Sequence, residues 1–165
     1  NSPFDFTFMK NFQNKARIVK VSKIVRNILF AGLVLWLVVG IPCALIQVFN
    51  LWKNIGSKAT IYLQGGAAVL IFLSFIINLH LFRFFDRLKN GYLFDVKTVG
   101  HLNSAGKWWI VLWLLEILFY EIGHRVFQIS QAWNVDGLFV GLALIFVAWL
   151  LREAQELQEE QEFTV

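Results

Sequence analysis

The chain has 165 residues, of which 58% are hydrophobic, 16% are aromatic and 16% are charged, and its formal net charge is +4. A soluble domain carries about a quarter charged residues, so this composition excludes an ordinary soluble enzyme or binding domain. The charges lie in short blocks between long apolar runs, which predicts one integral membrane domain over residues 1–165. Cys43 is the single cysteine, which excludes an internal disulfide.

Four apolar runs predict the fold class: an all-α integral membrane four-helix bundle built from two helical hairpins. The predicted spans cover about residues 28–49, 61–82, 108–129 and 135–151. Pro42 predicts a bend in the first span. The small residues Gly65 to Ala68 indicate either a close approach of another helix or local flexibility at the start of the second span.

The segment before the first span is strongly basic. We expect residues 1–11 to be irregular and residues 10–26 to form a basic arm with apolar side chains at helical spacing. One interpretation is a helix on anionic headgroups, or a docking site for an acidic partner. The other is the ordinary positive flank of a first span.

Residues 83–107 form the longest polar stretch between apolar runs and are predicted to be the hinge between the two hairpins. Asn90-Gly91 predicts a turn that ends the second helix, and Asp95 is a predicted N-cap. A helix lying on the membrane surface would follow, until Gly106-Lys107 turns the chain back inward. Its apolar stripe would comprise Val96, Val99 and Leu102.

Counting Lys and Arg predicts the orientation. The arm has six, the hinge has five and Arg152 begins the tail, whereas the two opposite loops hold only Lys53, Lys58 and Arg125. Twelve cations against three predict that both termini and the hinge face the cytoplasm, so that the interfacial helices are cytoplasmic.

The tail, residues 152–165, is acidic and continues the helical spacing of the fourth span. It is either a solvated helix end or a latch onto the basic hinge or a soluble partner, and only a network of exposed ion pairs would hold such a latch. The candidate partner-binding residues are Arg83, Arg87, Lys89, Glu156, Glu159 and Glu160.

Polar side chains inside the predicted spans are candidates for function, because an ionisable group in a bilayer is costly. Glu116 lies deep in the third span, with Asn78 at a similar depth and with Tyr120 and His124 on nearly the same face. This set is either a proton or cation site, or a structural carboxyl bonded to a neighbouring helix. Glu121 and Arg125, with Asp136 across the outer loop, predict a structural ion pair or an external ligand site.

We find no motif for enzyme chemistry: no phosphate-binding glycine loop, no Ser/His/Asp set and no Cys pair. His80 and His101 fall near the predicted cytoplasmic face and His124 near the other, so the three do not predict a metal site. We therefore expect no enzyme activity, no cofactor and no metal.

The hinge and the tail resemble a small bacterial four-span membrane family of unknown function, the YoaS-like family. The hinge residues that carry the resemblance are Arg87, Leu88, Gly91, Phe94, Val99, Leu102 and Gly106. The ending Glu156–Val165, ELQEEQEFTV, is similar to the family's ending, with Phe163 where Leu is more usual. The resemblance implies a topology and a partnership with a small helix-turn-helix regulator, that is, sequestration of a transcription factor at the membrane.

These observations lead to three functional hypotheses. The first is a non-enzymatic regulatory or adaptor protein of the bacterial cytoplasmic (inner) membrane, which binds a soluble or membrane partner through its cytoplasmic face. The second is a small transporter or channel subunit that uses Glu116. The third is an accessory subunit of a larger membrane complex. The expected partners are anionic lipid headgroups, the regulator or the larger complex, with a homo-oligomer as a further alternative and no direct nucleic acid binding.

Overall fold

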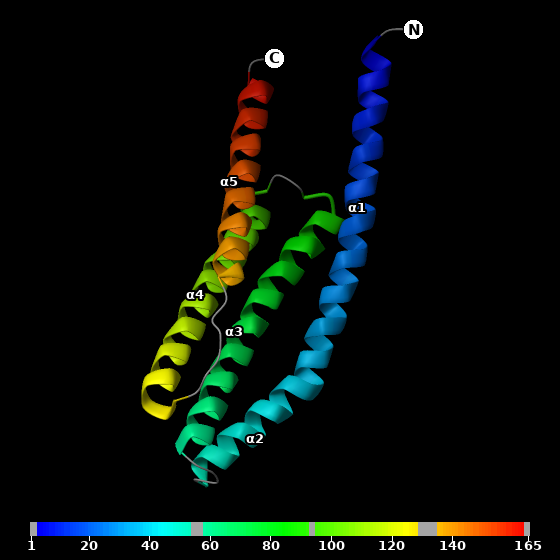
Figure 1. Cartoon of the computed structure of the whole chain (residues 1–165). Helices are drawn as coiled ribbons and strands as arrows, with labels where there is room; N and C mark the ends of the chain where they lie inside the picture. The colour runs from blue at the N-terminus through cyan, green and yellow to red at the C-terminus, as the bar shows by residue number, and fades with distance from the viewer. Residues whose placement is uncertain (1–2, 54–57, 93–94, 129–134, 164–165) are drawn as a thin grey trace.

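The protein is helical through the part of the chain that the structure describes. The structure, a computed structural model, describes residues 3–53, 58–92, 95–128 and 135–163. Figure 1 shows its helices: α1 (Pro3–Leu35), the π-helix η1 (Trp36–Gly40), α2 (Ile41–Trp52), α3 (Lys58–Lys89), α4 (Val96–Phe127) and α5 (Asp136–Phe163). The predicted all-α class is confirmed.

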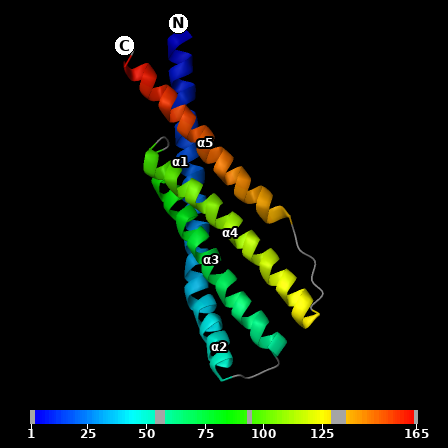
Figure 2. The ribbon, with the colours of Figure 1, turned by 90° about the vertical axis from the view of Figure 1, so that its left-hand side faces the viewer.

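The helices pack in chain order. α3 contacts α1, α2 and α4, and α4 contacts α3 and α5, whereas no comparable packing joins α1 to α5 within the described ranges. Figures 1 and 2 show the first turns of α1, the last turns of α5 and the connection from α3 to α4 toward one end of the molecule, which we call the hinge end. The bundle is therefore open between its first and last helices.

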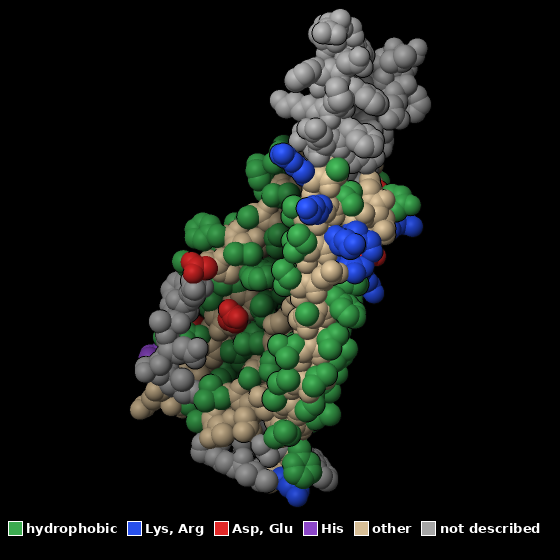
Figure 3. All heavy atoms as spheres, turned by 90° about the vertical axis from the view of Figure 1, so that its right-hand side faces the viewer, with side chains coloured by type: hydrophobic (Ala, Val, Ile, Leu, Met, Phe, Trp, Pro, Cys, Tyr) green, Lys and Arg blue, Asp and Glu red, His purple; other side chains and the backbone are tan. Residues whose placement is uncertain are grey.

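Three helical segments are long and apolar enough to cross a membrane: Ala16–Phe49, Lys58–Lys89 and Asp136–Leu157. Their large side chains are mostly exposed, and Figure 3 shows a side of the molecule covered with hydrophobic atoms. Such a surface is stable in lipid and not in water, so the described helices are compatible with a membrane helical bundle. α4 has 32 residues but carries Lys107, Glu116, Glu121 and Arg125, and it is not among these segments.

The N-terminal segment differs from the prediction. We expected residues 1–11 to be irregular, but α1 begins at Pro3 and runs through the basic arm into the first apolar segment without a break. Proline is tolerated at a first helical position, because its missing N–H is one of those that a helix start leaves unpaired anyway. The arm is thus the first half of a long helix and not a separate interfacial helix.

The bend predicted at Pro42 is present, and a π-helix accompanies it (Figure 1). Proline lacks an N–H and its ring crowds the carbonyl four residues earlier, which here is Val38 within η1. The N–H of Ile41 bonds to the carbonyl of Trp36, five residues back. The Trp36 ring stacks on Phe75 at 4.4 Å and its Nε1 donates to the carbonyl of Ile71 at 3.1 Å, which ties the bend to α3.

α3 ends where the sequence predicts, at Asn90-Gly91. Gly91 has φ 86°, the N–H of Gly91 donates to the Leu88 carbonyl at 3.0 Å, and that of Tyr92 donates to the Arg87 carbonyl at 3.1 Å. These two bonds and the positive φ form a Schellman motif, for which glycine is preferred because it has no side chain to clash. Asp95 occupies the N-cap position of α4 as predicted, but its side chain makes no capping hydrogen bond.

The turn predicted at Gly106-Lys107 is wrong, because α4 continues through both residues. Gly106 serves packing instead. A Cβ added to Gly106 would lie 2.7 Å from Ile145 Cγ1 and 2.9 Å from the carbonyl oxygen of Gly141, and one added to Gly141 would lie 2.6 Å from Ile110 Cγ1. α4 and α5 therefore cross in backbone contact, so the surface helix that we expected in the hinge is the first part of α4.

Two further glycines let helices approach closely. An added Cβ at Gly137 would lie 2.9 Å from Trp113 Cδ1, so Gly137 and Gly141 form a G-x-x-x-G contact of α5 with α4. A Cβ on Gly66 would lie 3.3 Å from Phe119 Cδ1. Of the two interpretations of Gly65 to Ala68, the close approach of another helix is the one observed at Gly66.

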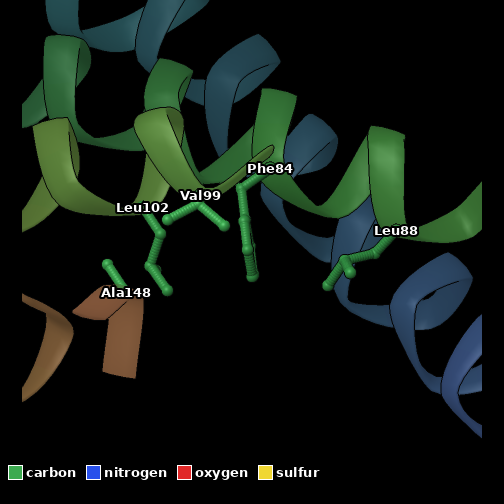
Figure 4. Close-up of a cluster of buried hydrophobic side chains, with 5 residues drawn as sticks. All are labelled: Phe84, Leu88, Val99, Leu102 and Ala148. Atoms are coloured by element: carbon green, nitrogen blue, oxygen red, sulfur yellow. The ribbon is translucent and has the colours of Figure 1, made fainter. Parts of the chain in front are cut away.

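A cluster of buried hydrophobic side chains lies where α3, α4 and α5 meet. Figure 4 shows its members converging from these three helices: Phe84, Leu88, Val99, Leu102 and Ala148. Because Leu88 precedes the Asn90-Gly91 turn and Val99 is in the first turn of α4, the cluster packs the hinge end. This cluster holds the last turns of α3 and the first turns of α4 against α5.

Substituting Gly106→Ala tests the helix crossing. We expect a loss of about 1–3 kcal/mol in the free energy of unfolding, as for other overpacked contacts, measured by reversible denaturation in mixed micelles. Gly100→Ala is the matched control, because a Cβ there meets nothing within 4 Å, and alanine should stabilise α4 by up to about 1 kcal/mol. Equal stabilities of the two variants would contradict the crossing.

Candidate functional site

The hinge end holds most of the polar contacts, and Arg87 is at their centre. Its guanidinium forms an ion pair with Asp95, and its Nε donates to Thr98 Oγ1 at 3.0 Å. Thr98 is fully buried, and the ring of Tyr92 lies 5.3 Å from the guanidinium carbon. Arg87 therefore joins the end of α3 to the start of α4 across the turn.

A second group of charges joins α1 to α3. Arg26 lies 3.3 Å from the carboxylate of Asp86, and Lys89 lies 3.4 Å from the same oxygen. Each side chain is only partly buried, so each pair contributes about 1 kcal/mol or less. The basic arm is thereby fastened to α3 at Arg26, the residue closest to the apolar segment.

These contacts divide the predicted partner-binding residues into two groups. Arg87 and Lys89 are engaged in internal ion pairs, whereas Arg83 is exposed. On α5, Glu156 is exposed and accepts a hydrogen bond from Arg152 Nε at 3.1 Å, and Glu160 is also exposed. The side chain of Glu159 and residue Phe94 of the hinge pattern lie outside the described residues.

His80 and His101 meet between α3 and α4 at the hinge end. Their ring centroids are 5.7 Å apart at an interplanar angle of 49°, and Nδ1 of His80 is buried without a hydrogen-bond partner in the described part of the chain. Burial, and after it the positive charges of His80, Arg83 and Arg87, lower the pKa of His101 below its ordinary value of 6.5. The fold thus favours a neutral imidazole at position 101.

Within residues 3–53, 58–92, 95–128 and 135–163, no three His, Cys, Asp or Glu side chains gather closely enough to hold a metal ion. The two histidines therefore form a pair of rings and not a metal centre of three protein ligands. The third histidine, His124, is in the last turn of α4.

In the described part of the chain, no hydrogen bond or ion pair joins Glu116 to the other members of the predicted intramembrane set. Glu116 is exposed, and no hydrogen bond or ion pair connects it to another described residue. The Asn78 amide donates instead to the Ser74 carbonyl of its own helix at 3.4 Å. Tyr120 and His124 do share a face of α4, since their rings stack at 6.0 Å. Glu116 thus faces the open surface of α4.

The predicted outer ion pair is present: Arg125 Nε lies 3.3 Å from Glu121 Oε2. Both side chains are largely exposed, so its contribution to stability is small. Asp136 is the first residue of α5, where a negative charge is favourable next to the positive end of the helix dipole.

Sequence reasoning missed polar groups inside the helices. The side-chain oxygens of Gln47 and Gln64 are buried without a hydrogen-bond partner among the described residues, and Tyr62 Oη donates to the Phe119 carbonyl at 2.6 Å. Polar side chains within apolar runs are the signal that could have identified them. The Tyr62 bond adds a polar link between α3 and α4 beside the contact of Gly66 with Phe119.

Sequence analysis also missed a groove between α4 and α5 at the hinge end, lined by Val96–Asn103 on one side and Ile145–Glu156 on the other, with a volume of about 530 Å³. Residues from two helices form it, so no single stretch of sequence predicts it. Its lining includes apolar side chains and also Arg152 and Glu156, which are charged residues at the start of the tail.

Comparison of the chain with protein-family models, with curated proteins and with solved structures finds no match. The resemblance to the YoaS-like family therefore stays a prediction that depends on the hinge and tail residues alone.

The pKa of His101 predicts a pH dependence of stability. His101 binds a proton less tightly in the folded protein than in the unfolded chain. Its contribution to the free energy of unfolding is therefore complete above pH 6.5, and it is lost as the pH falls below that value. We expect the free energy of unfolding to be lower at pH 5.5 than at pH 7.5 and this difference to shrink in His101→Gln. Asn103→Gln, a neutral change on the same helix, is the control, and an equal pH dependence in both variants would refute the assignment.

Proposed function

We propose that the protein is a non-enzymatic regulatory or adaptor protein, which crosses the bacterial cytoplasmic membrane four times and binds a soluble partner at its cytoplasmic end. The observation that carries this proposal is the position of the acidic end of α5. It extends beyond the packed hinge, at the same end of the molecule as the basic arm (Figure 1).

Four crossings follow from the order of the helices if the three apolar segments span the membrane. α3 ends at the hinge end, and α4 runs from there to the opposite end (Figures 1 and 2). α5 begins beside the middle of α4, where a Cβ on Gly137 would meet Trp113, and runs back toward the hinge end. α4 also packs between α3 and α5. Lys97, Glu121 and Arg125 are then near the helix ends, whereas Lys107 and Glu116 lie farther inside α4.

The orientation is argued from the distribution of Lys and Arg. Figure 3 shows these side chains gathered toward the hinge end of the apolar surface, with few at the other end. Twelve of the fifteen cations belong to the arm, hinge and tail. Since loops rich in Lys and Arg stay in the cytoplasm, we assign the hinge end and both termini to the cytoplasmic side.

The partner surface is argued from charge. Arg87 and Lys89 of the hinge and Arg26 of the arm are already paired with Asp95 or Asp86, so part of the basic charge at the hinge end is used internally. The exposed charges on the last turns of α5 are acidic and include Glu153, Glu156 and Glu160. An acidic helix attracts a basic surface.

A small helix-turn-helix regulator, the partner that the resemblance implies, presents a basic surface to DNA. The acidic end of α5 would compete with DNA for that surface and hold the regulator at the membrane. The same exposed helix would serve an adaptor for another basic protein.

The accessory-subunit hypothesis is the second candidate, and Glu116 favours it. An exposed carboxyl within a membrane helix is costly, and Glu116 has no partner among the described residues of its own chain. A helix of a larger complex packed on the open face of α4 would supply the missing hydrogen bond or cation.

The topology predicts the labelling of introduced cysteines. In a Cys43→Ser background, a cysteine replacing Lys53 should react in intact cells with a maleimide that cannot cross the membrane, whereas one replacing Glu160 should react only after lysis. The reason is that Lys53 directly follows α2 and Glu160 is in the last turn of α5, and Figure 1 shows these two helix ends at opposite ends of the molecule. Labelling of position 160 from outside would refute the cytoplasmic assignment.

Partner binding is tested by capture in mild detergent, with the bound proteins identified by mass spectrometry. We expect the triple change Glu156→Gln, Glu159→Gln and Glu160→Gln to reduce the amount of the basic partner about tenfold, as the loss of about 1.4 kcal/mol would. Glu121→Gln, which removes an acid at the other end, is the control. Undiminished capture by the tail variant would contradict this proposal, and loss of a membrane complex in Glu116→Gln would favour the accessory subunit.

A further inference from the structure

The groove between α4 and α5 has properties that the proposed function does not use. α4 and α5 touch at the glycine crossing, and farther toward the hinge end they leave a space of about 530 Å³. Ligand sites commonly have volumes of about 300–1,000 Å³. The groove is thus large enough for a small or chain-like molecule.

The walls of the groove are apolar and incompletely covered. Trp149 is 54% exposed and Val96 is 69% exposed, while Val99 and Ala148 form the buried floor. Gly100 contributes no side chain, and a Cβ added there would meet nothing within 4 Å. The absence of a side chain at position 100 is therefore one reason that the groove is open.

The rim of the groove is polar and includes a cation. Arg152 is the first charge after the apolar run of α5, and its Nε bonds to Glu156 at 3.1 Å. A guanidinium has five N–H donors, so this bond leaves donors for an anion. The Asn103 side chain, on the α4 wall, adds an amide to the polar lining.

The polarity changes along the groove as it does across a membrane surface. Ile145 belongs to the apolar, membrane-crossing part of α5, whereas Glu156 is three turns nearer the chain end, among the charges of the tail. An occupant must be apolar beside Ile145 and anionic beside Arg152. A phospholipid of the adjoining leaflet presents both groups at this depth.

The apolar lining of the groove suits a narrow chain. An α-helix with its side chains is about 10 Å across. An acyl chain is narrower and adapts to a bent apolar wall. Trp149, an aromatic side chain at the boundary of the apolar run, is the residue type that proteins place at the level of lipid headgroups.

We propose that this groove is a binding site for one membrane phospholipid. Its acyl chain lies along Val99, Ile145 and Trp149, and its phosphate accepts hydrogen bonds from Arg152. Arg152 exchanges part of its contact with Glu156 for the phosphate, a stronger charge-assisted partner. The lipid fills the gap between α4 and α5 and adds to the packing at the base of the acidic tail.

The test is native mass spectrometry of the full chain, purified in mild detergent and supplied with phosphatidylglycerol or phosphatidylethanolamine. We expect one lipid retained per chain. Gly100→Leu places an apolar side chain in the groove from a position where an added Cβ meets nothing within 4 Å, and it should reduce the retained fraction about tenfold, through the loss of apolar contact with the lipid. Gly32→Leu is the matched control, because a Cβ at this α1 glycine also meets nothing within 4 Å.

Two further variants test the rim. Arg152→Gln should weaken lipid retention severalfold, whereas Glu156→Gln, which breaks the same ion pair but keeps the guanidinium, should leave retention equal or higher. Circular dichroism of each variant shows whether the helices are intact.

Retention by Gly100→Leu equal to that of the wild-type chain overturns the proposal, as does an equal loss in Gly32→Leu. Unchanged lipid retention combined with loss of a captured protein would assign the groove to a polypeptide and also overturns it. The measurement uses the purified chain without a soluble partner, so its outcome is independent of the partner-binding proposal.

Discussion

The close contact of α4 and α5 at Gly106 and Gly141 is the constraint on which the hinge end depends. It sets the point at which two apolar helices touch backbone to backbone, without side chains between them. Beyond this point the helices diverge, so the buried cluster of Phe84, Val99 and Ala148 fills one side of the gap and the groove occupies the other. The same contact sets the position of α5 along α4, and therefore how far the acidic turns of α5 lie from the start of α4. A larger residue at either glycine would change all three features together.

Several charged side chains at the hinge end form ion pairs that join the helices to one another. Arg87 connects α3 to α4 through Asp95 and Thr98, and Asp86 connects α3 to Arg26 of α1. These contacts use cations that a sequence-based analysis assigns to lipid or to a partner. Other exposed charges are of opposite sign on different elements: Arg83 on α3, and glutamates on the last turns of α5, where Glu156 is paired with Arg152. The proposed basic partner would contact these acidic turns, and the proposed lipid phosphate would contact Arg152 at their base.

Much of the architecture follows from local patterns, and the failures have identifiable physical reasons. Apolar runs between charges predict the helices, and Asn90-Gly91 predicts the turn because glycine accepts a positive φ. Gly106 was misassigned since glycine serves equally for a turn and for close helix packing, and only the partner helix decides between them. The Gly137–Gly141 spacing was visible but not used. The pairing of Arg87 with Asp95, the meeting of His80 with His101 and the groove depend on residues from separate helices, which no single segment specifies.

The π-helix before Pro42 has a consequence for the basic arm. A π turn holds about one residue more than an α turn, so it offsets the angular phase of the helix by about 100°. All side chains on the N-terminal side of Trp36 are thus rotated about the helix axis relative to their positions in a continuous α-helix. The rotation of the arm about the helix axis, and with it the direction in which each of its side chains points, is set by a five-residue segment far from any of its lysines. Gain or loss of one residue in that segment would turn every side chain of the arm while leaving its composition unchanged.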